Sequence, residues 1–332
     1  MMISISSGAW ADATCMVEDA ERILVVTHVS PDGDAIGSLL GMGNALQALG
    51  KTVDLAVDDG VPEFVNFLPG AEMVKSKLTI GKWDLMISVD ASDEARTGKC
   101  GEYGRAHSDK VINLDHHPTN TMFGDVHLVK SDAVSATEVI FLWLDEMDFA
   151  FIPPVTIPLL TGLVTDTLGF RTSNVNASTL DIAQTLMECG ASLTEITERT
   201  LDTRSVLVVN LWKQALATAQ MHEGGVFAAD IKLDFIKQAG LREVTDGGLV
   251  GFLVRTNEAM IAVVFKEQDD GHVDVSLRCK PGFDVGSVAF AIGGGGHKQA
   301  AGAKLAMTLE EAHQKVLPLL IEAAKKGKLV IA

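Results

Sequence analysis

The stretch ILVVTHVSPDGDAIGSLLGMGNALQALG, residues 23–50, decides the fold of the first half of the chain. Residues 23–29 form a short apolar run rich in β-branched side chains, which is typical of a buried parallel strand. Residues 35–49 follow with the spacing of a helix, and Gly50 stands where a helix commonly ends. A strand that enters a helix through a polar loop predicts an alternating α/β fold.

The same alternation continues along the first half of the chain. Short apolar runs predict further strands, and helical spacing predicts the segments between and after them. The strands are expected at residues 52–57, 85–89 and 111–114, and the helices at residues 135–147, 154–167 and 178–189. This order predicts a mostly parallel sheet with helices on both of its faces.

A chain of 332 residues is longer than one typical domain, and its pattern changes after Gly225. Strands and one closing amphipathic helix are expected there, at residues 226–231, 260–265, 273–279 and 308–325. We predict a catalytic α/β domain, a helical connector and a smaller α/β domain, at residues 1–190, 191–225 and 226–332.

Charge limits the partners that the chain can have. The sequence holds 27 Lys and Arg against 44 Asp and Glu, which gives a formal charge of −17. Because neutralising phosphates drives the binding of long nucleic acid, this balance argues against a long duplex as partner. A nucleotide or a short RNA is compatible with it.

The sequence predicts neither a membrane span nor a secretory signal, and hence no membrane partner. Its most apolar region, residues 152–169, is interrupted by three prolines and by Asp166. The N-terminus lacks a basic segment followed by an apolar core. The cysteines are too far apart for a disulfide framework or a thiolate zinc site, which favours the cytoplasm: Cys15, Cys100, Cys189 and Cys279.

Acidic and histidine side chains follow three of the predicted strands, and one more aspartate ends another apolar segment. Ligands of open α/β sheets bind beyond the carboxyl ends of the strands, so we expect these side chains to lie near one another. They are His28, Asp32 and Asp34, then Asp90, then Asp115, His116 and His117, and finally Asp166.

Crowded carboxylates repel one another unless cations lie between them. Imidazole and carboxylate ligands without thiolate favour Mn²⁺ over Mg²⁺, and this many ligands suit two ions sharing one carboxylate. Two ions about 3.5–4 Å apart can polarise a phosphoryl group and generate hydroxide. Taken singly, Asp32 or Asp90 could instead cap a helix, and the Asp-His-His triplet could lie on a solvated loop.

The glycine run at residues 293–296 is the second signal. Such a backbone can turn successive amides toward an anion, and His297 would add a donor to a phosphate. Arg278, on the strand before it, could make a bidentate contact. The alternative is a flexible hairpin or a loop that ends a helix. The presence of the acidic cluster favours phosphate binding.

Together these segments resemble the DHH phosphoesterase family, in the branch with a DHH-associated C-terminal domain. Within the family, the likeness is to the NrnA-type oligoribonucleases, which also dephosphorylate 3′-phosphoadenosine 5′-phosphate. Five motifs carry it: THVSPDGDAIGS from Thr27, SVDASD from Ser88, NLDHHPTN from Asn113, TDTLGFRTSN from Thr165 and GGGGHKQAAGA from Gly293. The resemblance implies a hydrolase that cuts nanoRNA or dinucleotides to mononucleotides, or releases phosphate.

The resemblance also implies the two sets of metal ligands. One Mn²⁺ would be held by His28, Asp32 and Asp90, and the other by Asp34, Asp90, His116 and Asp166, with Asp90 as the bridge. Two Mn²⁺ per chain are implied, with Mg²⁺ or Co²⁺ able to substitute. A homodimer is implied as well.

The remaining roles that the resemblance implies concern the substrate. His117 would contact the scissile phosphate, and Asp115 would orient a ligand histidine. The other phosphate or the base would be bound between the two domains, by Arg278, Gly294, Gly295, Gly296 and His297.

Other functions share part of this pattern. A RecJ-like single-strand exonuclease usually carries an extra nucleic-acid-binding domain, for which 332 residues leave little room. A cyclic-dinucleotide phosphodiesterase is a nearer alternative, whereas a soluble pyrophosphatase lacks a domain with this glycine-histidine loop. A nucleotide-binding regulator without activity would have lost metal ligands, and here every expected position is filled.

Overall fold

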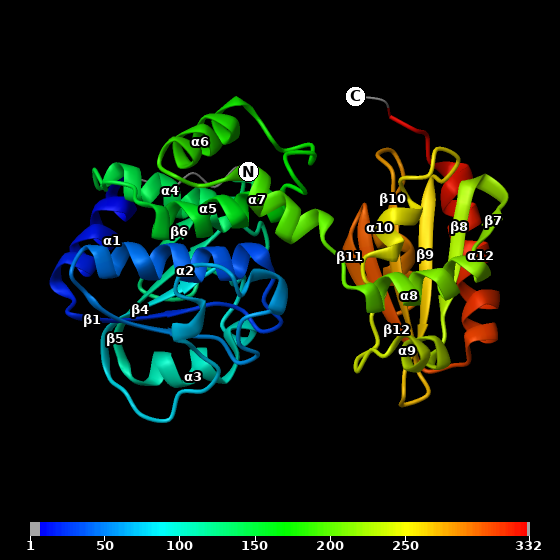
Figure 1. Ribbon diagram of the computed structural model, residues 1–332, viewed down its shortest axis with the longest axis horizontal. Helices are drawn as coiled ribbons and strands as arrows, with labels where there is room; N and C mark the ends of the chain where they lie inside the picture. The colour runs from blue at the N-terminus through cyan, green and yellow to red at the C-terminus, as the bar shows by residue number, and fades with distance from the viewer. Residues whose placement is uncertain (1–6, 331–332) are drawn as a thin grey trace. The chain divides into compact units, whose positions relative to one another are not determined.

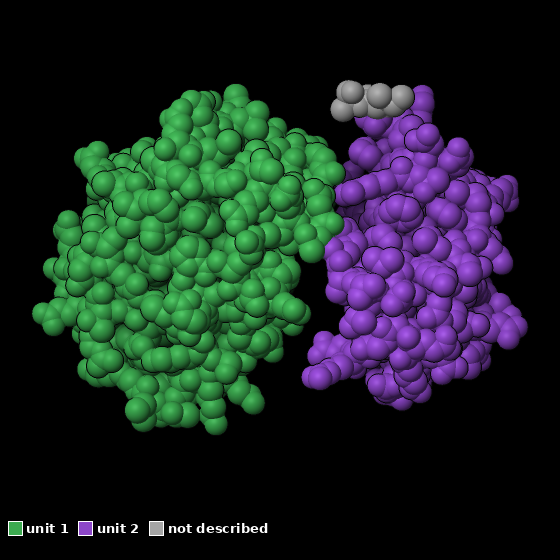
Figure 2. Space-filling model, in the orientation of Figure 1, with its two compact units in different colours: residues 1–203 green, residues 204–332 purple. Residues whose placement is uncertain are grey.

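The computed structural model describes residues 7–330, in two compact units that divide between Thr203 and Arg204 (Figure 2). The division falls inside the stretch 191–225 that the sequence predicts as a connector. The first six residues of the predicted catalytic domain and the last two of the predicted C-terminal domain lie outside the described range. Each unit has its own sheet, with one hydrophobic core on each face of that sheet.

The first unit is built on a sheet of six parallel strands, in the order β3-β2-β1-β4-β5-β6 (Figure 1). The chain leaves β1 toward one side of the sheet and returns to its other side with β4, so the order reverses between β1 and β4. The strands are β1 (Arg22–Val26), β2 (Thr52–Ala56), β3 (Val74–Lys75), β4 (Trp83–Val89), β5 (Ser108–Asp115) and β6 (Val126–Val129).

Helices cover both faces of this sheet, which confirms the predicted α/β class (Figure 1). On one face lie α1 (Ser7–Asp19), α2 (Gly33–Ala48), α4 (Ala136–Glu146) and α5 (Pro153–Asp166), with α6 (Ala177–Glu188) and α7 (Leu193–Thr197) packed on α5. The other face is covered by α3 (Gly98–Ala106). Alternate residues of β1 point to opposite faces of the sheet. Ile23 and Val25 pack in the core on one face, and Leu24 and Val26 pack in the core on the other.

The second unit has a mixed sheet in the order β11-β12-β10-β9-β8-β7, which confirms the smaller α/β domain. Only β8 and β9 run parallel. The strands are β7 (Gln220–His222), β8 (Val226–Ile231), β9 (Ile261–Glu267), β10 (Val273–Cys279), β11 (Gly295–His297) and β12 (Ala300–Leu305). The helices are α8 (Val206–Ala215), α9 (Leu233–Ala239), α10 (Leu249–Leu253), α11 (Gly286–Ala291) and α12 (Leu309–Lys326).

Two cores hold the helices of the second unit to opposite faces of its sheet. Leu211 of α8 and Leu249 of α10 pack with Ala262 and Val264 of β9. Val288 of α11 and the buried residues of α12 pack on the other face. Within residues 7–330, the helices are too short or too polar to cross a membrane.

Candidate active site

The predicted metal ligands of the first unit gather at one edge of its sheet, where the strand order reverses. Loops that leave neighbouring strands in opposite directions open a crevice at such a point. His28, Asp32 and Asp34 follow β1, Asp90 follows β4, His116 follows β5, and Asp166 ends α5. The backbone of Asp90 has a φ of 55°, a left-handed conformation that aspartate adopts more readily than most residues.

Potential ligand atoms form three groups within residues 7–330. His28, Asp32 and Asp90 offer one set, Asp34, His116 and Asp166 another, and within each set the atoms lie within 4.8 Å of one another. The third set, Asp90, Asp115, His116 and His117, shares Asp90 with the first and His116 with the second. Asp90 thus connects the first two sets: its Oδ2 lies 3.6 Å from His28 Nε2, and its Oδ1 lies 3.7 Å from His116 Nε2.

Backbone carbonyls orient His28 and His116. His28 Nδ1 lies 2.8 Å from the carbonyl oxygen of Val29, and His116 Nδ1 lies 3.4 Å from that of Ala133. Because a carbonyl only accepts, Nδ1 carries a proton in both rings, and each Nε2 faces the carboxylates. This orientation is the one that a histidine needs to ligate a metal through Nε2.

The carboxylates are too crowded to be ionised together without cations. Burial raises the pKa of Asp90 well above its ordinary value, and the charges of Asp34 and Asp32 raise it further. Burial also raises the pKa of Asp34, and it brings the pKa of Asp166 to about 8. Asp90 Oδ1 is buried and accepts no hydrogen bond from residues 7–330. A buried carboxylate oxygen without a donor is a fit for a cation.

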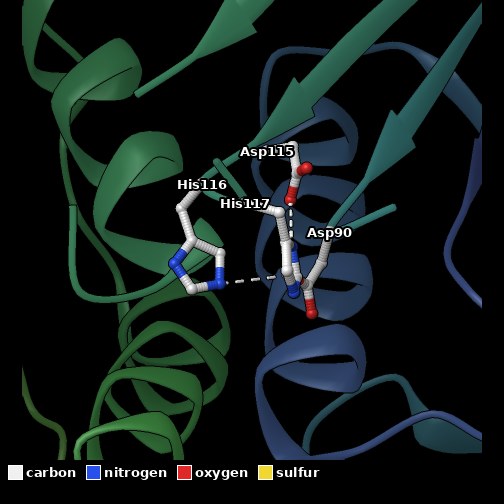
Figure 3. Close-up of side chains that lie close together, drawn as sticks. All are labelled: Asp90, Asp115, His116 and His117. Carbon is white, nitrogen blue, oxygen red and sulfur yellow. Dashed lines mark hydrogen bonds and ion pairs between the residues drawn. The ribbon is translucent and has the colours of Figure 1, made fainter. Parts of the chain in front are cut away.

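The third member of the triplet, His117, makes a different contact from His116 (Figure 3). Its Nδ1 donates to Asp115 Oδ1 at 2.8 Å, and Asp115 is fully buried. The other oxygen of Asp115 accepts from Asn120 Nδ2 at 2.6 Å. The hydrogen bond to Asp115 raises the pKa of His117, while burial opposes the rise. His117 is therefore fixed by Asp115, and a third of its side chain remains exposed.

The predicted substrate residues lie in the second unit and share one face of its sheet. Arg278 of β10 pairs with Ala300 of β12, which pairs with His297 of β11. Directly paired residues point to the same side of a sheet, so the exposed Arg278 and His297 face the same way. Gly295 and Gly296 form part of the exposed strand β11, and Gly294 precedes it.

Three side chains near the site were not predicted from the sequence. Asn120 holds Asp115, and Thr137 holds Asp34 with a hydroxyl contact of 2.8 Å. Glu138 is buried beside them, and burial raises its pKa. Ser135 and Glu138 have the Ser-x-x-Glu spacing that marks the start of a helix, a signal that was available. Nothing in the sequence places that helix beside Asp34.

Comparison with known families accounts for both units. Residues 22–164 match the DHH family, N-terminal domain, and residues 230–326 match the DHHA1 domain. The chain is 34% identical to the bifunctional oligoribonuclease and PAP phosphatase NrnA of Thermus thermophilus. That alignment covers 90% of this chain and 89% of the relative.

Solved structures show the same fold. An exopolyphosphatase-related protein from Bacteroides fragilis superposes with a TM-score of 0.87 over 98% of both chains, at 23% identity. RecJ of Thermus thermophilus in complex with Mn²⁺ superposes with a TM-score of 0.54 at 14% identity, over all of this chain and 57% of RecJ. At these identities the likeness is one of fold.

Proposed function

The chain belongs to the DHH family, and from that membership we propose that it is a phosphoesterase that uses two divalent cations. Its proposed substrates are short oligoribonucleotides, dinucleotides among them, and 3′-phosphoadenosine 5′-phosphate. The observation that carries the proposal is the pair of ligand groups that meet at Asp90. The relatives' names and the acidic charge of −17 favour short substrates over long nucleic acid.

Six residues of the first unit would hold the two cations. His28, Asp32 and Asp90 would hold one cation, and Asp34, Asp90, His116 and Asp166 the other. When bound, two such ions polarise a phosphoryl group and activate water. We propose Mn²⁺ as the ion, because nitrogen and oxygen ligands are mixed, with Mg²⁺ or Co²⁺ able to substitute.

His117 would bind the scissile phosphate. The hydrogen bond from its Nδ1 to Asp115 leaves Nε2 free, and the raised pKa of His117 favours a proton there. A protonated Nε2 donates a charge-assisted hydrogen bond to a phosphoryl oxygen, on which negative charge grows during hydrolysis. Arg278, His297 and the glycines Gly294, Gly295 and Gly296 would bind a second phosphate or the base.

Two measurements test this function. Elemental analysis of the purified protein should find two divalent cations per chain, and an Asp90→Ala, His116→Ala double variant should lose both the metal and the activity. Assays on 3′-phosphoadenosine 5′-phosphate, pApA, a cyclic dinucleotide and a 20-nucleotide RNA should show preference for the first two. Preference for the 20-mer, or full activity in a metal-free protein, would contradict the proposal.

A further inference from the structure

The carboxylate of Asp34 is held by the first turn of a helix that lies about a hundred residues further along the chain. Its Oδ2 accepts from the backbone N–H of Ala136 at 2.6 Å. Its Oδ1 accepts from the backbone N–H and from the hydroxyl of Thr137, at 3.2 and 2.8 Å. Asp34 is 2% exposed, so these donors replace the water that the carboxylate loses on burial.

The helix that supplies these donors is well defined. The cap of α4 is Ser135, whose hydroxyl accepts from the backbone N–H of Glu138 at 3.1 Å. The N–H groups of Ala136 and Thr137 therefore stay free to reach Asp34. Unpaired N–H groups and the helix dipole both favour a negative charge at this end of a helix.

A glycine of α5 closes the other side of the same carboxylate. A Cβ added at Gly162 would meet the methyl carbon of Thr137 first, and would lie 2.6 Å from Asp34 Oδ1 and 2.8 Å from the Thr137 hydroxyl. These separations are too short for unbonded atoms, so the space that a side chain would fill is taken by the carboxylate of Asp34 and the side chain of Thr137. This close approach is independent of the hydrogen bonds and constrains the same group.

The neighbouring carboxylates are less constrained. Asp32 is exposed, and its Oδ1 accepts from the N–H groups of Asp34 and Ala35 at 3.1 and 3.0 Å. The Oδ1 of Asp90 accepts no hydrogen bond from any described residue. Of Asp32, Asp34 and Asp90, Asp34 is thus the carboxylate that direct donors and packing fix most fully before a cation is present.

We propose that Thr137 and Gly162 are positioning residues that preset Asp34 as a ligand for one of the two cations. The inference rests on the two-cation function proposed above. A ligand held in place before binding loses little conformational freedom when the ion arrives, so the ion binds more tightly. Both residues act through Asp34, and neither would touch the ion.

The test of Thr137 is calorimetric titration of the metal-free full chain with Mn²⁺. Thr137→Val keeps the shape of the side chain and removes the hydroxyl donor. It should weaken one of the two binding events by about 10- to 100-fold and leave the other near its original value. Thr137→Ser, which retains the hydroxyl, should restore the affinity to within about threefold. Equal affinities in the wild type and in Thr137→Val would overturn the proposal.

The test of Gly162 uses a matched glycine of the same helix contact. At Gly41 of α2, an added Cβ would lie 2.5 Å from a terminal methyl of Leu159, a flexible side chain away from Asp34. Gly162→Ala should weaken the same Mn²⁺ event that Thr137→Val weakens, whereas Gly41→Ala should leave both events unchanged. If the two alanine variants change Mn²⁺ affinity equally, Gly162 contributes only to packing, and its proposed role in positioning Asp34 is overturned. This pair also decides the matter if Thr137→Val does not fold.

Titration of the wild type with Mn²⁺ distinguishes a failure of the proposed function from a failure of this inference. A wild-type chain that binds no Mn²⁺ would remove the proposed function and this inference together. A wild-type chain that binds two ions, with Thr137→Val binding them equally well, would remove the inference alone. Circular dichroism and urea unfolding of each variant show whether weaker Mn²⁺ binding comes from a displaced Asp34 or from an unfolded protein.

Discussion

At the scale of single residues, hydrogen bonds from neighbouring side chains fix the candidate site residues in place. Asp115 is fully buried between two donors, His117 and Asn120, at 2.8 and 2.6 Å. Burial alone would raise the pKa of Asp115, but the hydrogen bond and the charge of His117 hold it below its ordinary value. Asp115 therefore stays ionised and holds the imidazole of His117 in one orientation.

Asp115→Asn should impair catalysis while leaving the cations bound. The amide cannot serve both donors as a carboxylate does, so His117 loses its fixed orientation and the charge beside it. We expect kcat to fall by about 10- to 100-fold, with two cations still found by elemental analysis. Asp125→Asn is the control, because Asp125 is exposed and belongs to none of the ligand groups. A variant that loses its metal instead would make Asp115 a ligand.

The sequence pattern predicts the candidate ligands, but it does not predict the residues that hold them. His28, Asp90 and His116 could be grouped because the ends of parallel strands share one edge of a sheet. That grouping needs only the order of the strands. The contact of Thr137 with Asp34 spans 103 positions and depends on how α4 packs beside α2. Local patterns contain no information on that contact.

At the scale of elements, the glycines of α2 allow it to approach α5 closely. A Cβ added at Gly37 would lie 2.6 Å from the carbonyl oxygen of Pro158 and 2.9 Å from the backbone N of Gly162. Both are backbone atoms, which cannot turn away as a side chain can. This contact sets the spacing between α2, which begins at the site, and α5, which ends at Asp166.

Gly37→Ala should therefore destabilise the first unit by about 1–3 kcal/mol, as overpacking of a close contact does. Gly251, a helical glycine of α10, is the control, because an added Cβ there meets nothing within 4 Å. Gly251→Ala should be neutral or stabilising by up to about 1 kcal/mol, since alanine favours the helix. Urea unfolding measures both. A Gly37→Ala protein as stable as the wild type would mean that the two helices can separate freely.

The edge of the same sheet depends on an ionised aspartate. Asp54 of β2 accepts from Lys75 Nζ at 2.6 Å and from Trp83 Nε1 at 2.8 Å. Burial tends to raise the pKa of Asp54, but these hydrogen bonds outweigh it and hold the pKa below its ordinary value. A lowered pKa in the folded state adds stability above the pKa of the unfolded chain, and this stability is lost as the pH falls through the folded value.

Asp54→Asn should accordingly lower the free energy of unfolding by roughly 1 kcal/mol at pH 7, the size of a partly exposed charged hydrogen bond. The difference from the wild type should shrink once the pH falls below about 3.9, where the unfolded carboxyl is protonated. Unfolding curves at several pH values check this. A difference that stays constant with pH would show that the charge of Asp54 is not involved.

Several regular elements followed from periodicity, whereas α1, α3, β12 and the shortest strands were not predicted. The strands expected at residues 226–231 and 273–279 are found with those bounds, and the helix expected at 308–325 is α12, Leu309–Lys326. The strand β3 has two residues and β11 has three, too few for an alternating pattern. They exist because a neighbouring strand offers hydrogen bonds, and β11 places His297 beside β12.

At the scale of the whole molecule, each unit can bury its own apolar surface. Leu211 and Ala215 of α8 pack with Ala229 and Ala262 of the second sheet, so α8 is part of the second unit. The sequence showed α8 only as a helix in a connector, because an amphipathic pattern does not say which sheet the apolar side covers. The division after Thr203 leaves all the ligand groups in the first unit and Arg278 and His297 in the second.

Residues 1–203 expressed alone should therefore fold and bind Mn²⁺ with the affinity of the full chain, but hydrolyse pApA poorly. Losing a charged contact to a substrate phosphate costs about 2–5 kcal/mol, so kcat/KM should fall by at least about 30-fold. Arg278→Gln in the full chain should reproduce part of this loss with its metal content unchanged. A truncated protein as active as the full chain would show that the second unit has no role in binding the substrate. A truncated protein that fails to fold would show that the first unit depends on the second for its stability.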